Sequence, residues 1–145
     1  MSKKPQIFLN YLHSSVILKE RDRLKKFLIS MFKHEGKTAG TINIIFCTDD
    51  YLLEINKNFL KHNYYTDIIT FDLSEISSTI INSDIYISYD RVKENALIHK
   101  VSIPKELHRV IFHGILHLCG FKDKTAKDIK IMRSKENQYL SQYFI

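Results

Sequence analysis

The distribution of apolar and polar residues along the chain predicts short β-strands that alternate with amphipathic helices. Segments of strand length, rich in Ile, Phe and other β-formers, are Gln6–Asn10, Thr41–Cys47, Asp67–Asp72 and Asp84–Ser88. Thr41–Cys47 alternates only partly, so we expect it to lie in the middle of a sheet with both faces covered. A polar, Ser-rich loop, Leu73–Ser83, is predicted before the last strand.

Apolar residues at helical spacing predict five helices: Ile17–Lys33, Asp49–Phe59, Asp90–His99, a helix from the Ser102 cap to Cys119, and Ala126–Tyr143. Thr48 and Ser102 are suitable N-caps, and Pro104 fits the first turn, where a missing N–H costs little. The inner faces are predicted to contain Ile17, Leu24, Phe27, Leu28 and Met31 in the first helix, and Ile129, Met132, Tyr139 and Leu140 in the last.

This pattern predicts one α+β domain over residues 1–145, with a mixed four-stranded sheet and about five helices. A chain of 145 residues can bury one adequate core but not two, and it shows no repeat or Gly/Pro/Ser-rich linker. The helix that ends near Cys119 is expected to pack on one face of the sheet.

Charge and composition narrow the possible partners and compartment. The net charge of +6 and the pI near 9.2 favour an anionic partner, and RNA fits, although basicity alone is weak support. No apolar run reaches membrane-span length, and no signal-peptide core follows Met1–Pro5. Cys47 and Cys119 occur in apolar segments and are expected to be buried free thiols, which suits the cytoplasm.

Candidate chemistry is concentrated in the segment from His113 to Asp123. Histidines four apart on a helix lie on the same face, so the imidazoles of His113 and His117 can bind one ion. Gly120 can end the helix in a left-handed conformation, after which Asp123 can return a carboxylate to that ion. The His pair alone is equally compatible with an ordinary helix surface. Together, the three side chains predict one catalytic Zn²⁺ per chain with an open coordination position.

Gly114 argues against the most familiar activity of such a helix, which is peptidase activity. Zinc peptidases of the HExxH type place a Glu directly after the first His as the general base. Gly114 has no side chain that could move a proton, so protein is disfavoured as the substrate.

The motif resembles the signature of YbeY-type endoribonucleases, which are bacterial rRNA maturation factors and read H-G-x-L-H-L-x-G-[YF]-D-H. The match covers His113, Gly114, Leu116, His117, Leu118, Gly120 and Phe121. It departs at Lys122-Asp123, where Asp123 takes the position of the third metal-binding His. We interpret this change as a replaced ligand, whose negative charge should make metal-bound water a weaker acid.

The resemblance extends from about Thr41 to Leu140. The segments similar to the family are Thr66–Phe71, Ser83–Ile85, Glu106–Arg109, Met132 with Glu136, and Asn56 with Phe59. One departure bears on mechanism, because the family usually has an Arg, thought to act in catalysis, where this chain has Leu60 followed by Lys61. Lys61 and Arg109 are therefore the expected contacts to RNA phosphate, although Arg109 could instead pair with a carboxylate.

The resemblance implies a zinc-dependent, single-strand-specific endoribonuclease that acts in rRNA maturation, including processing of the 16S rRNA 3′ end, and in ribosome quality control. The implied partners are RNA of the small ribosomal subunit and, with it, ribosomal proteins or an assembly GTPase. Zinc would lower the pKa of bound water toward about 7 and polarise a phosphoryl oxygen. The sequence does not separate attack by water from activation of the RNA 2′-OH, and no residue stands out as general base.

Two other functions stay open. One is a non-catalytic RNA-binding factor in ribosome assembly with a mainly structural metal, and the other, least favoured, is a different small metal hydrolase.

Asp67 and Asp84 are interpreted first as turn-forming carboxylates, with Asp84 the next candidate ligand if Asp123 is not one. The loop with Lys61, His62, Tyr64 and Tyr65 is interpreted either as a solvated loop with packing tyrosines or as a surface for base stacking.

Overall fold

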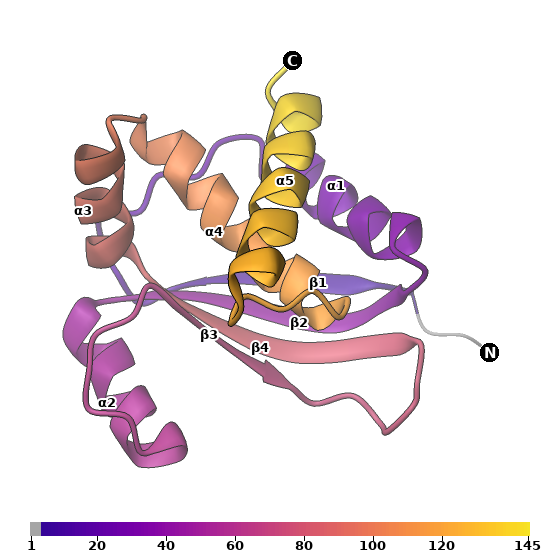
Figure 1. Ribbon diagram of the computed structural model, residues 1–145, viewed down its shortest axis with the longest axis horizontal. Helices are drawn as coiled ribbons and strands as arrows, with labels where there is room; N and C mark the ends of the chain where they lie inside the picture. Colours follow the sequence, from indigo (N-terminus) through magenta and orange to yellow (C-terminus); the bar gives the residue numbers. More distant parts are fainter. Residues whose placement is uncertain (1–3) are drawn as a thin grey trace.

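The computed structural model describes residues 4–145, and one four-stranded sheet forms the centre of the fold (Figure 1). Its strands are β1 (Gln6–Tyr11), β2 (Thr38–Cys47), β3 (Ile68–Asp72) and β4 (Ile80–Ser88), in the order β1-β2-β4-β3. β1 and β4 run parallel to β2, whereas β3 is antiparallel to β4. The predicted mixed sheet is confirmed, with β2 in its interior. Residues 1–3 lie outside the described residues, so the structure does not test the predicted absence of a signal segment there.

Five helices complete the described part of the chain: α1 (Arg21–His34), α2 (Asp49–Leu60), α3 (Tyr89–His99), α4 (Ile103–Leu118) and α5 (Ala126–Tyr143). In Figure 1, α1 and α4 cover one face of the sheet, α5 packs against α4, and α2 lies on the opposite side. Within residues 4–145 no helix is both long and apolar enough to cross a lipid bilayer.

Alternating side chains of the strands form two apolar layers. The larger core lies between the sheet and the helices α1, α4 and α5, and contains Ile42, Ile44 and Phe46 of β2 together with Phe112 of α4. A smaller cluster lies under α2 and contains Cys47, Leu52, Ile55 and Ile69. The sheet is therefore covered on both faces, as the partly alternating pattern of β2 predicted.

Gly114 allows α4 to approach the sheet closely. A Cβ built at Gly114 would lie 2.8 Å from Ile68 Cδ1 on β3 and 3.5 Å from Ile85 Cγ2 on β4. A side chain at this position would therefore require the end of the Ile68 side chain to shift. The absence of a side chain where a peptidase has its base thus also favours close packing of the helix that carries His113 and His117.

The predicted start of the first helix, the predicted start of the last strand and two inner-face assignments were wrong. The first helix begins at Arg21 and not at Ile17, because Glu20 adopts a left-handed conformation (φ 52°), and Ile17 is 73% exposed. β4 begins at Ile80, because Ile80 and Ile81 pair with Thr38 and Ala39, so the predicted loop Leu73–Ser83 is shorter. Ile129 is exposed and does not belong to the inner face of α5.

Candidate metal centre

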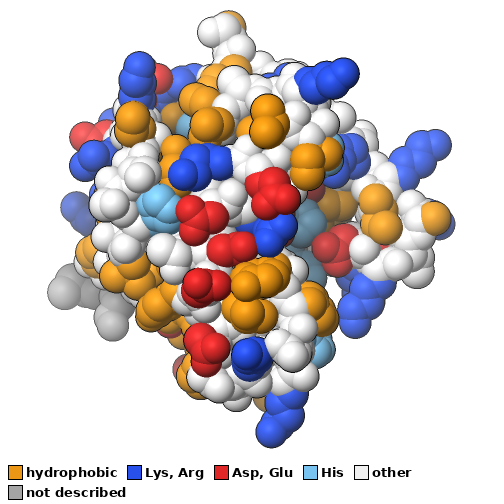
Figure 2. All heavy atoms as spheres, turned by 90° about the vertical axis from the view of Figure 1, so that its left-hand side faces the viewer, with side chains coloured by type: hydrophobic (Ala, Val, Ile, Leu, Met, Phe, Trp, Pro, Cys, Tyr) orange, Lys and Arg blue, Asp and Glu red, His pale blue; other side chains and the backbone are white. Residues whose placement is uncertain are grey.

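The three predicted metal ligands line one cavity of about 370 Å³. His113 and His117 come from the last two turns of α4, and Asp123 comes from the segment between α4 and α5. The other wall is formed by the segment from Tyr64 to Thr70, which leads into β3. Figure 2 shows histidine side chains in a hollow beside an acidic side chain, on the face that lies to the left in Figure 1.

A buried carboxylate of α5 orients the His113 ring. His113 Nδ1 lies 2.7 Å from Glu136 Oε2, and Glu136 is only 3% exposed. A carboxylate only accepts hydrogen bonds, so Nδ1 of His113 donates and Nε2 of the neutral ring keeps its lone pair. An acceptor behind a ligating His is the usual support of a protein metal site.

Glu136 is itself held by two arginines. Its Oε1 lies 3.1 Å from Arg109 Nη1 and 3.2 Å from Arg133 Nη1. These cations stabilise the ionised carboxylate inside the protein, where an unpaired charge would be costly. Arg109 therefore pairs with a carboxylate, which is the second of its two interpretations from the sequence.

The end of α4 orients His117. Its Nδ1 lies 3.1 Å from the carbonyl oxygen of Phe121, which can only accept, so Nε2 is again left for a ligand. Gly120 has φ +104°, as predicted, and this conformation turns the chain back beside the helix end. The same turn thus brings both the Phe121 carbonyl and Asp123 toward the His pair.

The spacing of His113 and Asp123 fits a shared ion. His113 Nε2 lies 3.3 Å from Asp123 Oδ2. Two donor atoms that are each about 2.0–2.2 Å from a tetrahedral Zn²⁺ are separated by about 3.3–3.6 Å. Across residues 4–145, however, no three His, Cys, Asp or Glu side chains already enclose an ion position. The structure thus brings His113 and Asp123 to the spacing of a shared ion, and His117 lines the same cavity.

Burial and neighbouring charges shift the pKa values of two residues at the cavity. Burial raises the pKa of Asp67, despite the opposing effect of the nearby His113. Burial alone would lower the pKa of His113, but the hydrogen bond and charge of Glu136, with Asp123 and Asp67, raise it. Sequence reasoning missed Asp67 as a cavity residue, because a carboxylate before a strand is more often a turn former. Its place in the family-like segment Thr66–Phe71 was the available signal.

The other residues considered from the sequence lie apart. Lys61 is exposed at the C-cap of α2 and does not line the cavity, whereas Leu60 and Lys124 do. Asp84 accepts a hydrogen bond from Asn43 Nδ2 at 3.0 Å and lines a different groove with Tyr51 and Tyr86. The contact of Lys61 or Arg109 with RNA stays a prediction.

Comparisons with known proteins point to one family. The model of the family described as endoribonuclease YbeY matches residues 12–144. A Cytophaga hutchinsonii protein named endoribonuclease YbeY is 46% identical over 139 residues, which are 96% of each chain. One from Porphyromonas gingivalis is 48% identical over 115 residues, 79% of this chain and 75% of the relative. The solution structure of TM1509 from Thermotoga maritima superposes with a TM-score of 0.65 at 29% identity, covering 96% of this chain and 89% of the other.

Proposed function

Because the chain belongs to the endoribonuclease YbeY family, we propose that it is a zinc-dependent endoribonuclease that cuts single-stranded RNA during rRNA maturation. The relatives carry the name endoribonuclease over nearly the same length of chain. We further propose that the substrate is rRNA of the small ribosomal subunit, that processing of the 16S 3′ end and ribosome quality control are its context, and that it works in the cytoplasm. Ribosomal proteins or an assembly GTPase are its proposed partners.

The observation that supports this proposal is the orientation of His113 and His117 in one cavity. Each ring uses Nδ1 for a protein acceptor, which leaves both Nε2 atoms for a metal. With Asp123 they would hold one Zn²⁺ per chain, and the zinc would activate water and polarise a phosphoryl oxygen. Three protein ligands leave a coordination position for the substrate, which a closed structural site does not have.

The remaining side chains of the cavity have separate roles in the proposed reaction. Lys124 is exposed at the cavity wall and can contact an RNA phosphate. Asp67 is the lining carboxylate outside the ligand set, and burial raises its pKa, which suits a group that takes up and returns a proton. Glu136 holds the His113 ring, and Arg109 pairs with Glu136 and lines an adjoining hollow together with His113 and Asp123.

The decisive experiment measures cleavage of a single-stranded RNA that contains the 16S 3′ region. Zinc-loaded wild-type protein should cut it, and His117→Ala should lose activity by at least 100-fold, since a metal ligand is removed. His34→Ala removes an exposed histidine of α1, far along the chain from the cavity, and should cut like wild type. A wild-type protein that binds this RNA with zinc present but never cuts it would support the non-catalytic assembly factor instead.

A further inference from the structure

The loop of residues 61–67, between α2 and β3, carries aromatic rings to the cavity. His62 and Tyr64 line the same cavity as His113 and His117, and Tyr64 is 57% exposed. We propose that His62 and Tyr64 form a stacking site for one unpaired RNA base beside the scissile phosphate. This inference rests on the proposed RNA-cleaving function and names the residues that would select single-stranded substrate.

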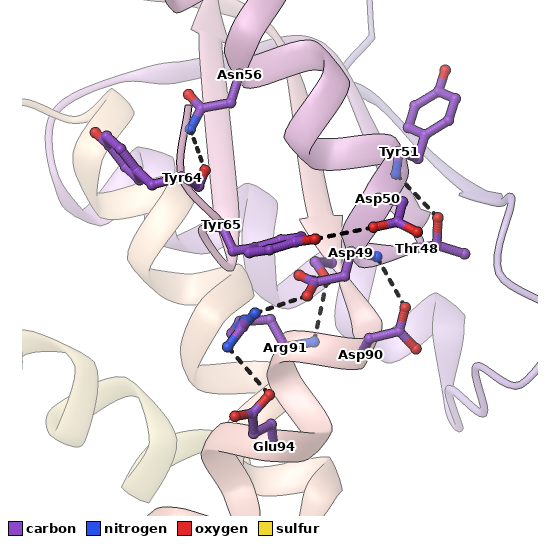
Figure 3. Close-up of polar contacts among 11 residues, drawn as sticks. Thr48, Asp49, Asp50, Tyr51, Asn56, Tyr64, Tyr65, Asp90, Arg91 and Glu94 are labelled. Carbon is purple, nitrogen blue, oxygen red and sulfur yellow. Dashed lines mark hydrogen bonds and ion pairs between the residues drawn. The ribbon is translucent and has the colours of Figure 1, made fainter. Parts of the chain in front are cut away.

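A buried amide fixes the backbone of this loop. Asn56 is 2% exposed, and its Nδ2 donates a hydrogen bond to the carbonyl oxygen of Tyr64 at 2.9 Å (Figure 3). The carbonyl oxygen of Asn56 accepts from His62 N at 3.0 Å, while Lys61 closes α2 in a left-handed conformation (φ 56°). The loop is therefore ordered from the core of α2, and its rings need little further ordering when a ligand binds.

The two rings are already arranged as the start of a stack. Their centroids are 5.1 Å apart with 18° between the planes, and Tyr64 Oη lies 2.9 Å from His62 Nδ1. Neither ring is buried in the protein, so hydrophobic burial does not explain their placement. A nucleobase has a flat face of matching size, and stacking it on such a pair removes apolar surface from water.

The neighbouring Tyr65 has a different, structural role. Its Oη donates to Asp50 Oδ1 at 3.3 Å, and its ring lies 5.3 Å from the guanidinium carbon of Arg91. Arg91 is fixed by Asp49 at 2.8 Å and by Glu94 at 3.2 Å (Figure 3). Tyr65 thus points toward carboxylates that repel RNA phosphate, and acidic side chains gather on this face in Figure 2. Of the two tyrosines, only Tyr64 lines the cavity.

This arrangement provides a physical reason for single-strand preference. In a duplex, each base is covered by its stacked neighbours, and only a splayed base offers a free face. A base held on Tyr64 would leave its adjoining phosphate within the same cavity as the proposed metal ligands. Stacking would therefore position the backbone as well as add affinity.

The test combines ring removal with base removal. A 12-nucleotide, single-stranded 2′-O-methyl RNA, in which the 2′-OH route is closed, is bound to the full chain and to Tyr64→Ala. We expect Tyr64→Ala to raise Kd by about 5- to 150-fold, the range for losing one stacked base. Tyr64→Phe keeps the ring and loses only the hydroxyl. Its Kd should stay within about threefold of the wild-type Kd, because one hydrogen bond makes only a small net contribution. Tyr51→Ala, which removes a 46%-exposed tyrosine of α2, should bind like wild type.

Abasic nucleotides placed one at a time locate the stacked base. At one position, loss of the base should weaken binding to wild type but not to Tyr64→Ala, because each change removes the same contact. The chain has no Trp, so Tyr64→Trp adds a single reporter whose fluorescence should be quenched by the single strand and not by a duplex. Tyr51→Trp should not be quenched by either.

Two results would overturn the inference, and they differ in what else they overturn. If wild type binds the RNA and Tyr64→Ala binds it equally well, the stacking site is wrong and the proposed function stands. If wild type neither binds nor cuts single-stranded RNA, the proposed function fails and the stacking site fails with it.

Discussion

At the scale of single residues, one proton connects the buried core with the candidate metal centre. Glu136, paired with Arg109 and Arg133, accepts a hydrogen bond from His113 Nδ1, which lies 2.7 Å from its Oε2. The opposite nitrogen therefore faces Asp123. This explains why a glutamate of α5 and an arginine of α4 matter to the cavity although neither needs to touch a substrate.

Asp123 can be tested by changing its charge and its donor atom. Asp123→Asn should weaken zinc binding, because an amide oxygen is a poorer zinc ligand than a carboxylate. Asp123→His should retain zinc and move the pH–activity profile toward acid, since the site loses a negative charge. Elemental analysis and pH profiles measure both effects. Unchanged metal content in Asp123→Asn, with an unmoved profile in Asp123→His, would show that Asp123 is not a ligand.

Glu136→Gln tests the positioning of His113. The amide can also present its NH₂ group to Nδ1, so the fixed tautomer is lost, and zinc affinity should fall by about 10- to 100-fold. Competition with a zinc chelator measures this affinity without any RNA. Glu35→Gln is the matched control, because Glu35 is also held against α5, by Lys135 and Tyr139. Equal zinc affinity in wild type and Glu136→Gln would refute this role.

At the scale of elements, α4 combines packing and chemistry. Its helical pattern, Ser102 cap and Gly120 end could be predicted because they depend on neighbouring residues. The N-terminal boundary of α1 could not be predicted in this way, since Leu18 is buried like a residue of the helix but lies before its start. Likewise, the Glu136–His113 pair spans 23 residues, and the place of Asp67 beside His113 depends on how β3 meets α4. Such contacts come from tertiary packing, which local pattern does not encode.

The contact between α4 and α5 should make stability depend on pH. Burial lowers the pKa of His108, whose ring stacks on Tyr143 at 5.0 Å and bonds the Pro104 carbonyl through Nδ1. The unfolded chain therefore binds a proton more readily than the folded one, so this contribution to stability is lost as pH falls below about 6.5.

His108→Phe keeps an aromatic ring at this contact and removes the titrating group. Unfolding free energies are measured by denaturant titration at pH 7 and pH 5. As the pH falls, wild type should lose more unfolding free energy than His108→Phe. Groups that titrate in both proteins cancel in this difference. A difference that stays constant over this range would mean that His108 does not contribute to acid sensitivity.

At the scale of the whole molecule, charge is unevenly arranged around the cavity. The net charge is +6, yet Asp49, Asp50, Asp90 and Glu94 lie together at the ends of α2 and α3 (Figure 3). On the other side, Lys124 lines the cavity and belongs to a Lys-rich segment that runs from Lys122 into α5. An RNA strand would be repelled by the first region and attracted by the second.

Lys124→Glu should weaken binding of single-stranded RNA and reduce its salt dependence. Losing one phosphate contact lowers the slope of log K against log salt by about 0.7. Lys26→Glu changes the net charge equally at an exposed position of α1, and it should leave that slope nearly unchanged. Equal losses in both variants would indicate that RNA follows overall charge and not this cavity.

The most direct measurement of the central claim is RNA cleavage during titration of metal-stripped protein with Zn²⁺. The His113, His117 and Asp123 set predicts no cleavage without metal, and activity that rises until about one zinc per chain is bound. His117→Ala should stay inactive over the same titration. Full cleavage by verified metal-free protein, or equal recovery in His117→Ala, would contradict the assignment of this cavity as the metal centre of an endoribonuclease.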